Sequence, residues 1–524
     1  MSTANPLSTF ANEPMTDFRD PANAQAMRKA IAEVRSQLGR EYDLVIDGVP
    51  LRTTGKITSV NPARPSEIVG VHQKAGPEQV EPAMQAALKA FETWQFIPVS
   101  DRANWLFRVA AILRKRKLEF SAWLVLEVGK NWDEAEADTC EAIDFCELYA
   151  RAALHLDQAE PVVQLPGERD LLRYIPLGVG AVIPPWNFPL AILAGMTVAS
   201  VVCGNTVMLK PSSDSPTIAA KFFEAMVEAG LPKGVVNFCP GAGGTFGEGL
   251  VRHPKTRFIA FTGSRDVGLG INLSAAQQQP GQLWIKRTIL EMGGKDGIVV
   301  ASDADLDSAA DGVAAAAFGF QGQKCSACSR VIVDASVYDA FLEKLIARVG
   351  PIVIGDPADN VRMGPVVNAS ALQSILSYID IGSKEGRIVA GGQIVSASQN
   401  SEQGYYVQPT VIADIAPNAR LAKEEIFGPV LAVIRARDFD DALAIANNTD
   451  YGLTGAVYTQ SPERIERAQR EFHVGNLYIN RKCTGAIVGA HPFGGFNMSG
   501  TDSKAGGADY LYLFTQAKSI GWKQ

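Results

Sequence analysis

The residues VGAVIPPWNFPLAILAGMTVASVVCGNTVMLK, at positions 179–210, give the first indication of the fold class. They belong to a run, residues 174–209, that contains no charged side chain. A membrane-spanning helix needs about 20 consecutive, predominantly apolar residues. Here Pro, Asn and Gly at positions 184, 185, 187, 189, 204 and 205 divide the run into a strand, a turn, a helix and a second turn. The run therefore predicts the buried interior of an α/β domain, without a membrane segment.

Further short apolar runs follow along the chain and are typical of buried parallel strands. Helical segments such as 218–229 separate them. Repeated strand–helix–strand units predict an open parallel sheet that binds a dinucleotide-type ligand at the carboxyl ends of its strands. The predicted strands are 179–183, 206–209, 235–238 and 258–261.

Helical periodicity marks the N-terminal part of the chain. Residues 1–40 are expected to form an N-terminal helical arm, because Met27, Ile31 and Val34 share one side of a helix over 23–38. A later helix is expected to begin after Ser100-Asp101, since either residue can act as an N-cap.

Length and composition restrict the class of protein. A chain of 524 residues is expected to contain two or three domains. The net charge of -7 argues against a nucleic-acid binder. Seven scattered cysteines, and an N-terminus without a signal-like apolar core, are typical of a cytoplasmic protein. C-x-x-C occurs once, at Cys325 and Cys328, and the histidines are dispersed, so no metal site is predicted.

Residues 318–330, FGFQGQKCSACSR, contain the candidate nucleophile. Cys325 follows a Gly-containing polar turn and stands beside Lys324. Only the thiolate is nucleophilic, and a neighbouring ammonium, turn amides or a helix start each increase its fraction. Two other interpretations remain open: Cys325 as a small core side chain, and a reversible thiol switch with Cys328.

A candidate phosphate site lies where the last of these strands ends. Gly263 and Ser264 follow the strand and open a helix, with Gly268 five residues after Gly263. Such a junction offers backbone amides and a helix N-terminus to a pyrophosphate. The usual G-x-G-x-x-G fingerprint is absent, and an ordinary Gly turn is the alternative interpretation.

Residues 318–330 resemble the nucleophile segment of the aldehyde dehydrogenase superfamily, and most closely its branch that oxidises L-glutamate gamma-semialdehyde. Further segments similar to that family follow in the family's order, over roughly residues 45–520. They are IPPWNFP at 183–189, KPS at 210–212, LEMGGK at 290–295, EEIFGP at 424–429, NRKCTGAIVG at 480–489 and HPFGG at 491–495.

The resemblance implies an α/β fold of the aldehyde dehydrogenase type with three parts. Residues 41–290 would form a Rossmann-type NAD-binding domain, and 291–492 an α/β catalytic domain. A small β oligomerisation arm near 155–175 would be joined by the C-terminal oligomerisation segment 493–524. Within that segment, 511–522 is expected to be a strand that completes a partner subunit's sheet.

The resemblance also implies the catalytic residues and the cofactor. Cys325 would be the nucleophile, Glu291 the general base, and Asn187 a hydrogen-bond donor to the oxyanion, together with the Cys325 amide. For Glu291 alone, a surface acid before a Gly turn is the alternative. Residues implied to bind NAD are Ile183, Pro184, Trp186, Lys210, Ser213, Gly263, Ser264, Gly268, Glu425 and Phe427.

One position departs from the pattern of the NAD-preferring family members. Many of them carry a Glu three residues after the lysine that corresponds to Lys210, and this chain has Ser213. A carboxylate there would repel a 2′-phosphate. NAD is therefore the expected cofactor, with NADP as the weaker alternative.

Substrate recognition is implied to depend on the substrate's α-carboxylate. The amides of Gly485 and Ala486 and the hydroxyl of Ser326 would hold it, and glycine suits such a loop because it lets the backbone approach closely. The side chains of Phe188 and Phe493 would enclose the aliphatic chain. Glu141, which shares a helix face with two aromatic residues, is implied to reach the mouth of the substrate site.

The expected function is therefore NAD-dependent oxidation of L-glutamate gamma-semialdehyde to glutamate in proline degradation. The expected assembly is a homo-oligomer, either a dimer or a dimer-based hexamer. The chain contains no preceding proline-oxidising domain, so a separate proline dehydrogenase is the candidate partner. Two alternatives remain: oxidation of another semialdehyde, such as succinate semialdehyde, and a non-catalytic cofactor-binding protein on the same fold.

Overall fold

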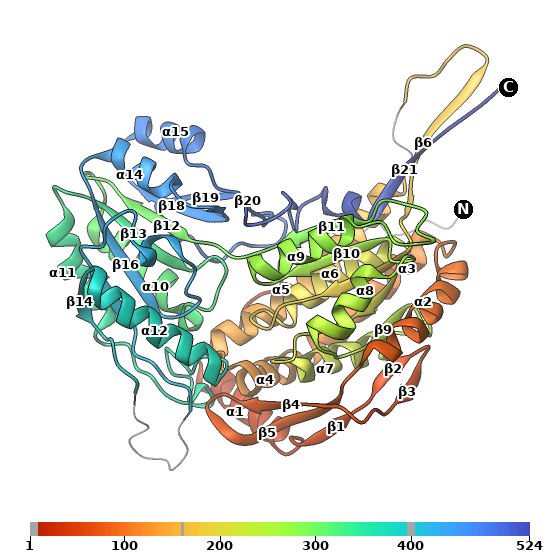
Figure 1. Cartoon of the computed structure of the whole chain (residues 1–524), viewed down its shortest axis with the longest axis horizontal. Coiled ribbons are helices and arrows are strands. Elements are labelled where there is room, and N and C mark those ends of the chain that lie inside the picture. The colour runs from red at the N-terminus through yellow and green to blue at the C-terminus, as the bar shows by residue number, and fades with distance from the viewer. Residues whose placement is uncertain (1–8, 159–161, 396–403, 524) are drawn as a thin grey trace.

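The computed structural model describes residues 9–158, 162–395 and 404–523. They form two α/β units that lie side by side, and a two-stranded ribbon projects from the first unit (Figure 1). Parts of three predicted segments, at 1–8, 159–161 and 524, lie outside the described residues. No helix within the described ranges is long and apolar enough to cross a membrane.

The first unit is built on a seven-stranded sheet in the order β11-β10-β7-β8-β9-β2-β3. β7 to β11 run parallel, and β2 pairs antiparallel with both β9 and β3. The predicted bounds of β7 and β8 are confirmed, and those of β9 and β10 differ by one residue. The strands are β2 (Leu44–Ile46), β3 (Val49–Leu51), β7 (Val179–Ile183), β8 (Thr206–Leu209), β9 (Val236–Phe238), β10 (Phe258–Thr262) and β11 (Arg287–Glu291).

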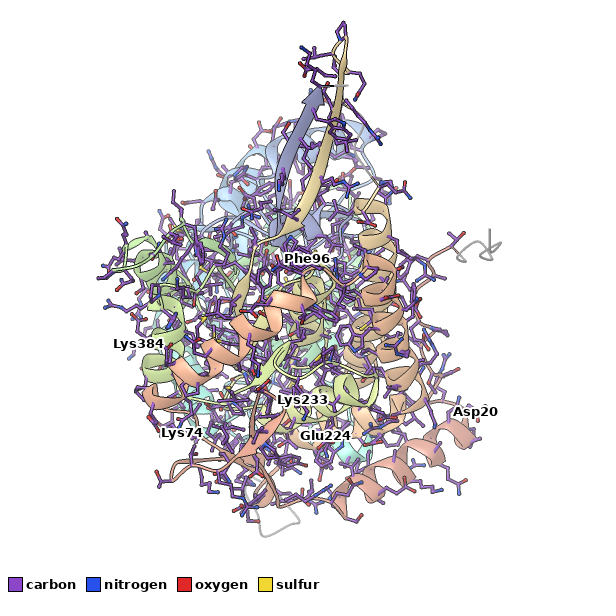
Figure 2. The ribbon with its side chains drawn as sticks, turned by 90° about the vertical axis from the view of Figure 1, so that its right-hand side faces the viewer. Asp20, Lys74, Phe96, Glu224, Lys233 and Lys384 are labelled. Carbon is purple, nitrogen blue, oxygen red and sulfur yellow. The ribbon has the colours of Figure 1, made fainter. Side chains whose placement is uncertain are left out.

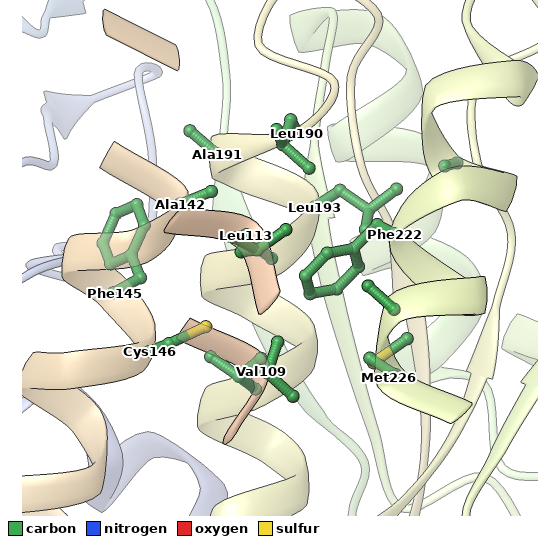
Figure 3. Close-up of a cluster of buried hydrophobic side chains, with 14 of the residues drawn as sticks. Val109, Leu113, Ala142, Phe145, Cys146, Leu190, Ala191, Leu193, Phe222 and Met226 are labelled. Atoms are coloured by element: carbon green, nitrogen blue, oxygen red, sulfur yellow. The ribbon is translucent and has the colours of Figure 1, made fainter. Parts of the chain in front are cut away.

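Helices cover both faces of this sheet. α2 (Val80–Trp94), α8 (Glu248–Arg252) and α9 (Arg265–Ala276) pack on one face. The opposite face is covered by α3 (Val99–Lys115), α4 (Lys117–Val128), α5 (Trp132–Leu156), α6 (Ala191–Val202) and α7 (Pro216–Glu228). Figure 3 shows buried side chains of α3, α5, α6 and α7 gathered in this core. α6 is the helix predicted within the charge-free run, and all of its residues except Ile192 are buried. Burying one large apolar side chain stabilises the fold by about 1.5–3 kcal/mol.

The predicted N-terminal helix is α1 (Pro21–Arg35), and it begins at Asp20, whose side chain accepts a hydrogen bond from the Ala22 amide. Its apolar stripe is buried and joins the core of the first unit against α4. A small sheet of β1 (Arg40–Tyr42), β5 (Arg64–Gln73) and β4 (Lys56–Asn61) adjoins it. The arm is thus packed on the first unit along its length from residue 21.

The predicted start of α3 was wrong by two to three residues. The helix begins at Val99, because the Pro98 carbonyl accepts hydrogen bonds from the amides of both Asp101 and Arg102. Ser100 and Asp101 therefore lie inside the first turn, where neither caps the helix.

The second unit contains another seven-stranded sheet, in the order β14-β15-β16-β13-β12-β18-β19. All neighbours are parallel except β14 and β15. Its strands are β12 (Asp296–Val300), β13 (Cys328–Asp334), β14 (Arg387–Ala390), β15 (Thr410–Ala413), β16 (Val430–Ala436), β18 (Thr454–Tyr458) and β19 (Asn476–Ile479). Its helices are α10 (Leu306–Phe318), α11 (Tyr338–Val349), α12 (Ala369–Glu385), α13 (Arg420–Lys423), α14 (Phe439–Asn447) and α15 (Pro462–Glu471).

The C-terminal strand begins later than predicted. β21 (Thr515–Lys523) pairs antiparallel over its whole length with β6 (Glu168–Pro176) of the same chain, and a 3-10 helix, Tyr510–Phe514, precedes it. Arg287 donates hydrogen bonds from one guanidinium nitrogen to the carbonyls of Tyr512, Leu513 and Thr515. These bonds stabilise the helical turn that precedes β21. Figure 2 shows the ribbon of β6 and β21 standing clear of the body.

Candidate active site

The candidate nucleophile lies in a tight turn between the two units. Cys325 follows a 3-10 helix, Gly319–Gly322, and precedes β13. Phe320 and Gln321 adopt left-handed backbone conformations, with φ of 48° and 57°. Such strain persists only where the surroundings impose it. The Gln321 amide donates to the carbonyls of Gly129 and Pro365, at 3.1 and 2.7 Å, which fixes the turn.

The electrostatic environment of Cys325 differs from the expectation. Lys324 does not activate the thiol, because its ammonium pairs with Glu134 at 2.6 Å. The turn leads into a strand and not into a helix. Burial raises the pKa of the Cys325 thiol well above its usual range, and the carboxylates of Asp296, Glu425 and Glu291 raise it further. The prediction of an activating lysine was wrong, since a carboxylate far away in the sequence neutralises it.

Asn187 connects the first unit to the nucleophile turn. It follows β7 and is buried. Its side-chain amide donates a hydrogen bond of 3.1 Å to the carbonyl of Gln323, two residues before Cys325. The structure therefore places Asn187 beside the nucleophile segment, and its role as oxyanion donor stays a prediction.

Glu291 is the last residue of β11, and its carboxyl is buried beside the C-terminal segment. The hydroxyl of Ser503 donates to Oε1, and Oε2 has no hydrogen-bond partner among the described residues. Burial raises the pKa of Glu291 to about 8, although the Ser503 hydrogen bond and the Lys504 charge act to lower it. Glu291 is therefore a buried acid whose charge acts on the Cys325 thiol, and not a surface acid. A carboxyl with this pKa suits a general base near neutral pH.

Glu425 approaches the backbone on the other side of Cys325. Its Oε1 accepts a hydrogen bond of 2.9 Å from the Gly294 amide, and burial raises its pKa to about 6. Phe427, with φ of 58°, places its ring edge-on to Trp186 at 5.6 Å between ring centroids. Trp186 of the first unit thus contacts Phe427 of the second, two residues after Glu425.

The other predicted cofactor residues lie at the carboxyl ends of the first sheet. Ile183 ends β7, and Pro184 is buried directly after it. Lys210 follows β8, and its ammonium donates to the carbonyls of Pro211 and Gly241 at 3.1 and 3.2 Å. Burial lowers the pKa of Lys210 to about 8. Ser213 is exposed in the next loop.

The strand–helix junction after β10 is present, but its glycines do not offer free amides. The Gly263 amide donates to the Glu291 carbonyl at 3.0 Å, and the Gly268 amide donates to the Ser264 carbonyl at 3.0 Å. A Cβ at residue 268 would stand 2.5 Å from the sulfur of Met292. The two glycines therefore serve close packing, and the helix N-terminus at Ser264 is what remains for an anion.

The predicted substrate residues lie on the second unit and on the charge-free run. Gly485, with φ of +79°, and Ala486 belong to the loop after β19. The sulfur of Cys483 lies 3.4 Å from the carbonyl oxygen of Ser326, which ties this loop to the nucleophile turn. Phe493 pairs through its backbone with Ala505. No ring contact between Phe188 and Phe493 is among the contacts of the described residues, and their shared role stays a prediction.

Sequence reasoning missed a buried ion pair beside Phe188. Lys130 and Asp138 are fully buried and paired at 2.8 Å, and the Lys130 ammonium lies 3.9 Å from the centroid of the Phe188 ring. Asp138 also accepts a hydrogen bond of 2.6 Å from the amide of Ala191, at the start of α6. The sequence did contain an indication of this acidic cluster, because the acidic residues at 134, 138 and 141 share one face of a helix.

Two further predictions concern Glu141 and Cys328. Glu141 lies on α5, and burial, followed by the Asp138 charge, raises its pKa to about 8. Cys328 is buried in the core of the second unit, with its sulfur 3.3 Å from the Arg330 carbonyl oxygen. All seven cysteines are free thiols.

Within the described residues, no group of three or more His, Cys, Asp or Glu side chains is placed to hold a metal ion.

Comparison with known proteins agrees with this geometry. The model of the aldehyde dehydrogenase family matches residues 51–520. The 1-pyrroline-5-carboxylate dehydrogenase of Geobacillus thermodenitrificans is 56% identical over 515 residues, which cover 98% of this chain and 99% of that protein. The protein of the same name from Bacillus mycoides is 56% identical over 511 residues, covering 97% and 98% of the two chains.

Solved structures give the same result. The 1-pyrroline-5-carboxylate dehydrogenase from Thermus with bound NAD superposes with a TM-score of 0.97 at 50% identity, covering 99% of this chain and 100% of that one. Proline utilization A from Bdellovibrio bacteriovorus superposes with a TM-score of 0.96 at 46% identity, covering 98% of this chain and 53% of that one. The chain therefore belongs to the aldehyde dehydrogenase family.

Proposed function

We infer that this protein catalyses the NAD-dependent oxidation of L-glutamate gamma-semialdehyde, the open form of 1-pyrroline-5-carboxylate, to L-glutamate. Its similarity to 1-pyrroline-5-carboxylate dehydrogenases extends over nearly the full length of both chains. One observation of the structure carries the proposal. The thiol of Cys325 lies within the electrostatic reach of two carboxyl groups from different units, Glu291 on the first and Glu425 on the second.

The residues fit a dinucleotide at this junction. Lys210 and the Ser264 helix start lie at the carboxyl edge of the first sheet, where such ligands bind. The Glu425 carboxylate lies directly against Gly293, where a Cβ would stand 2.1 Å from its Oε2 atom. When bound, NAD supplies the hydride acceptor for the oxidation. Glu425 and Phe427 would hold its nicotinamide end, and Lys210 its adenosine end.

The first step falls to Cys325. Its thiolate forms a C–S bond to the aldehyde carbon, and the carbonyl π electrons move to the oxygen. Asn187 and the Cys325 amide are proposed to donate hydrogen bonds to that oxyanion. Losing one donor of this kind typically lowers the rate by about 10²–10³. Burial and nearby carboxyl groups raise the pKa of the Cys325 thiol, so its proton would pass to solvent water before the thiolate attacks.

The second step falls to Glu291. After oxidation the substrate carbon is a thioester on Cys325. Glu291 takes a proton from a water molecule, whose oxygen bonds to the thioester carbon, and the C–S bond then breaks to release glutamate. The free Oε2 atom of Glu291 is the oxygen available for this proton.

We propose that the protein acts in the cytoplasm as a homo-oligomer, either a dimer or a dimer-based hexamer. Seven free thiols suit a reducing compartment. Apolar side chains on the ribbon, before β6 and on α9 are exposed; they include Trp522, Val163 and Leu273, respectively. A separate proline dehydrogenase is proposed as the source of the substrate, in keeping with the match to about half of the proline utilization A chain.

The test follows NADH formation with 1-pyrroline-5-carboxylate, succinate semialdehyde and acetaldehyde, for the wild type and for Cys325→Ala. Turnover should be strongest with the first substrate, because acetaldehyde has no carboxylate and the carboxylate of succinate semialdehyde stands one carbon nearer to its aldehyde, so neither fits the donors of the loop as well. The Cys325→Ala variant should be inactive and should still bind NAD. Dominant activity on succinate semialdehyde would contradict the substrate assignment. A wild type that binds NAD but turns over no aldehyde would be a non-catalytic cofactor-binding protein.

A further inference from the structure

A lysine that no assigned role includes lies beside the loop of Gly485 and Ala486. Lys482 follows β19 by three residues. Its Cε and Nζ atoms lie 3.4 and 3.8 Å from the position that a Cβ on Gly485 would occupy. Gly485 adopts a left-handed backbone conformation, with φ of +79°. The ammonium is therefore next to the backbone proposed to hold the carboxylate.

Lys482 forms no salt bridge within the described residues, although the Glu134 carboxylate acts on its charge. Lys324 pairs with Glu134, and Lys130 pairs with Asp138. The guanidinium of Arg481 is also engaged, because it donates to the carbonyls of Thr484 and Gly485 at 3.1 and 2.9 Å. Lys482 makes no hydrogen bond or ion pair with any other described residue.

Lys482 also lies near the nucleophile turn. The side chain of Lys482 is exposed to solvent. Lys324 is the residue directly before Cys325, and the sulfur of Cys483 contacts the Ser326 carbonyl. Lys482 thus belongs to the loop that the Cys483 sulfur ties to the nucleophile turn.

We propose that Lys482 is a specificity-determining residue whose ammonium attracts the substrate's carboxylate toward the amides of Gly485 and Ala486. The proposal rests on the proposed function, since it concerns the recognition of that same substrate. An ammonium on a flexible stem acts as a point charge and needs no fixed geometry. It attracts an anion before the chemical step and during it equally. It should therefore act on KM and hardly on kcat.

The experiment compares Lys482→Met, which removes the charge, with Lys482→Arg, which keeps it. Lys384→Met is the matched control, because Lys384 is an exposed lysine on α12 (Figure 2) that pairs only with Asp380. Each variant is assayed with 1-pyrroline-5-carboxylate and with butanal, an aldehyde without a carboxylate. Lys482→Met should raise KM for the first substrate about tenfold, with kcat within about twofold of wild type. KM for butanal should stay unchanged.

Two further results are expected. Lys482→Arg should keep KM within about threefold of wild type, because the charge remains. Added salt should raise the wild-type KM for 1-pyrroline-5-carboxylate and should affect the Met variant less, since salt screens exposed charges. The Lys384→Met control should behave as wild type throughout.

The proposal would be overturned if Lys482→Met left KM for 1-pyrroline-5-carboxylate unchanged, or raised KM for butanal equally. The second result would mean that the substitution disturbs the site as a whole. Failure of the proposed function looks different. In that case the wild type itself would oxidise butanal but not 1-pyrroline-5-carboxylate.

Discussion

Gly293 lies so close to Glu425 that a Cβ on residue 293 would stand 2.1 Å from the Glu425 Oε2 atom. Gly293→Ala must therefore displace the carboxylate and break its hydrogen bond to the Gly294 amide. If Glu425 holds the nicotinamide ribose, KM for NAD should rise about tenfold or more, corresponding to a loss of at least about 1.4 kcal/mol. Steady-state kinetics with varied NAD measure this.

Gly270→Ala provides the matched control for Gly293→Ala. Gly270 lies inside α9, and nothing stands within 4 Å of its Cβ position. In a helix interior the change from Gly to Ala stabilises by up to about 1 kcal/mol. The control should therefore keep KM for NAD and unfold at a slightly higher temperature. An unchanged KM for NAD in Gly293→Ala would remove Glu425 from the cofactor site.

The pH dependence of thioester hydrolysis should report the carboxyl of Glu291. Its pKa is raised to about 8, so the basic form, and with it the hydrolytic rate, should increase as the pH rises through about 8. Ser503→Ala removes a hydrogen bond that lowers this pKa and should move the inflection to higher pH. Asp502→Asn removes a negative charge that raises the pKa and should move it to lower pH. Shifts of equal sign in the two variants would exclude Glu291 as the titrating group.

Alkylation of Cys325 should be slow in the unliganded protein. Burial and three nearby carboxyl groups raise the thiol pKa well above its usual range, so little thiolate exists at neutral pH. Modification by iodoacetamide, followed by mass spectrometry of the Cys325 peptide, should accelerate as the pH increases beyond 9. A rate that levels off below pH 8 would mean that an activating charge acts on the thiol.

Breaking the buried pair of Lys130 and Asp138 should cost stability. Lys130→Met leaves the Asp138 carboxylate buried without its partner, and such changes typically destabilise by about 3–5 kcal/mol. Urea unfolding measures the change. The double variant with Asp138→Asn should recover much of the loss, because an amide oxygen can still accept the hydrogen bond from Ala191. A double variant as unstable as Lys130→Met would show that packing around Lys130, not its charge, carries the stability.

The cofactor preference should respond to residue 213. Ser213 is exposed after β8, and a carboxylate there would repel a 2′-phosphate. Ser213→Glu should lower kcat/KM for NADP about tenfold or more and leave kcat/KM for NAD within about threefold. Both are measured by cofactor reduction with the same aldehyde. If the ratio of the two cofactors stayed constant, residue 213 would not face the ribose.

Local patterns in the sequence were sufficient to predict the central strands of the first sheet. The charge-free run was predicted as a strand, turn and helix because its prolines and glycine mark the breaks, and β7, α6 and β8 follow that order. The start of α3 was misplaced because a backbone carbonyl, that of Pro98, takes the role expected of a side chain. Side-chain type is visible in a sequence, whereas a carbonyl of any residue can accept these bonds.

Non-local partners explain what the sequence did not reveal about the site. Lys324 was expected to act on Cys325, but Glu134 from α5 neutralises it. The Gly263 amide was expected to be free, but the carbonyl of Glu291 from the adjacent strand occupies it. Both partners are brought in by the packing of separate elements. No local sequence pattern indicates these two partners.

The position of Ser503 has a consequence for the synthesis of the chain. The carboxyl of Glu291 receives its hydrogen bond from Ser503, and Gly500 bridges to the Glu291 backbone. Asn205 and Arg287 likewise bind carbonyls in the segment 512–515. Since a protein is made from its N-terminus, Cys325 emerges from the ribosome well before these residues exist. A chain whose translation stops before residue 499 therefore contains Cys325 but lacks the residues that contact Glu291, the proposed base for thioester hydrolysis.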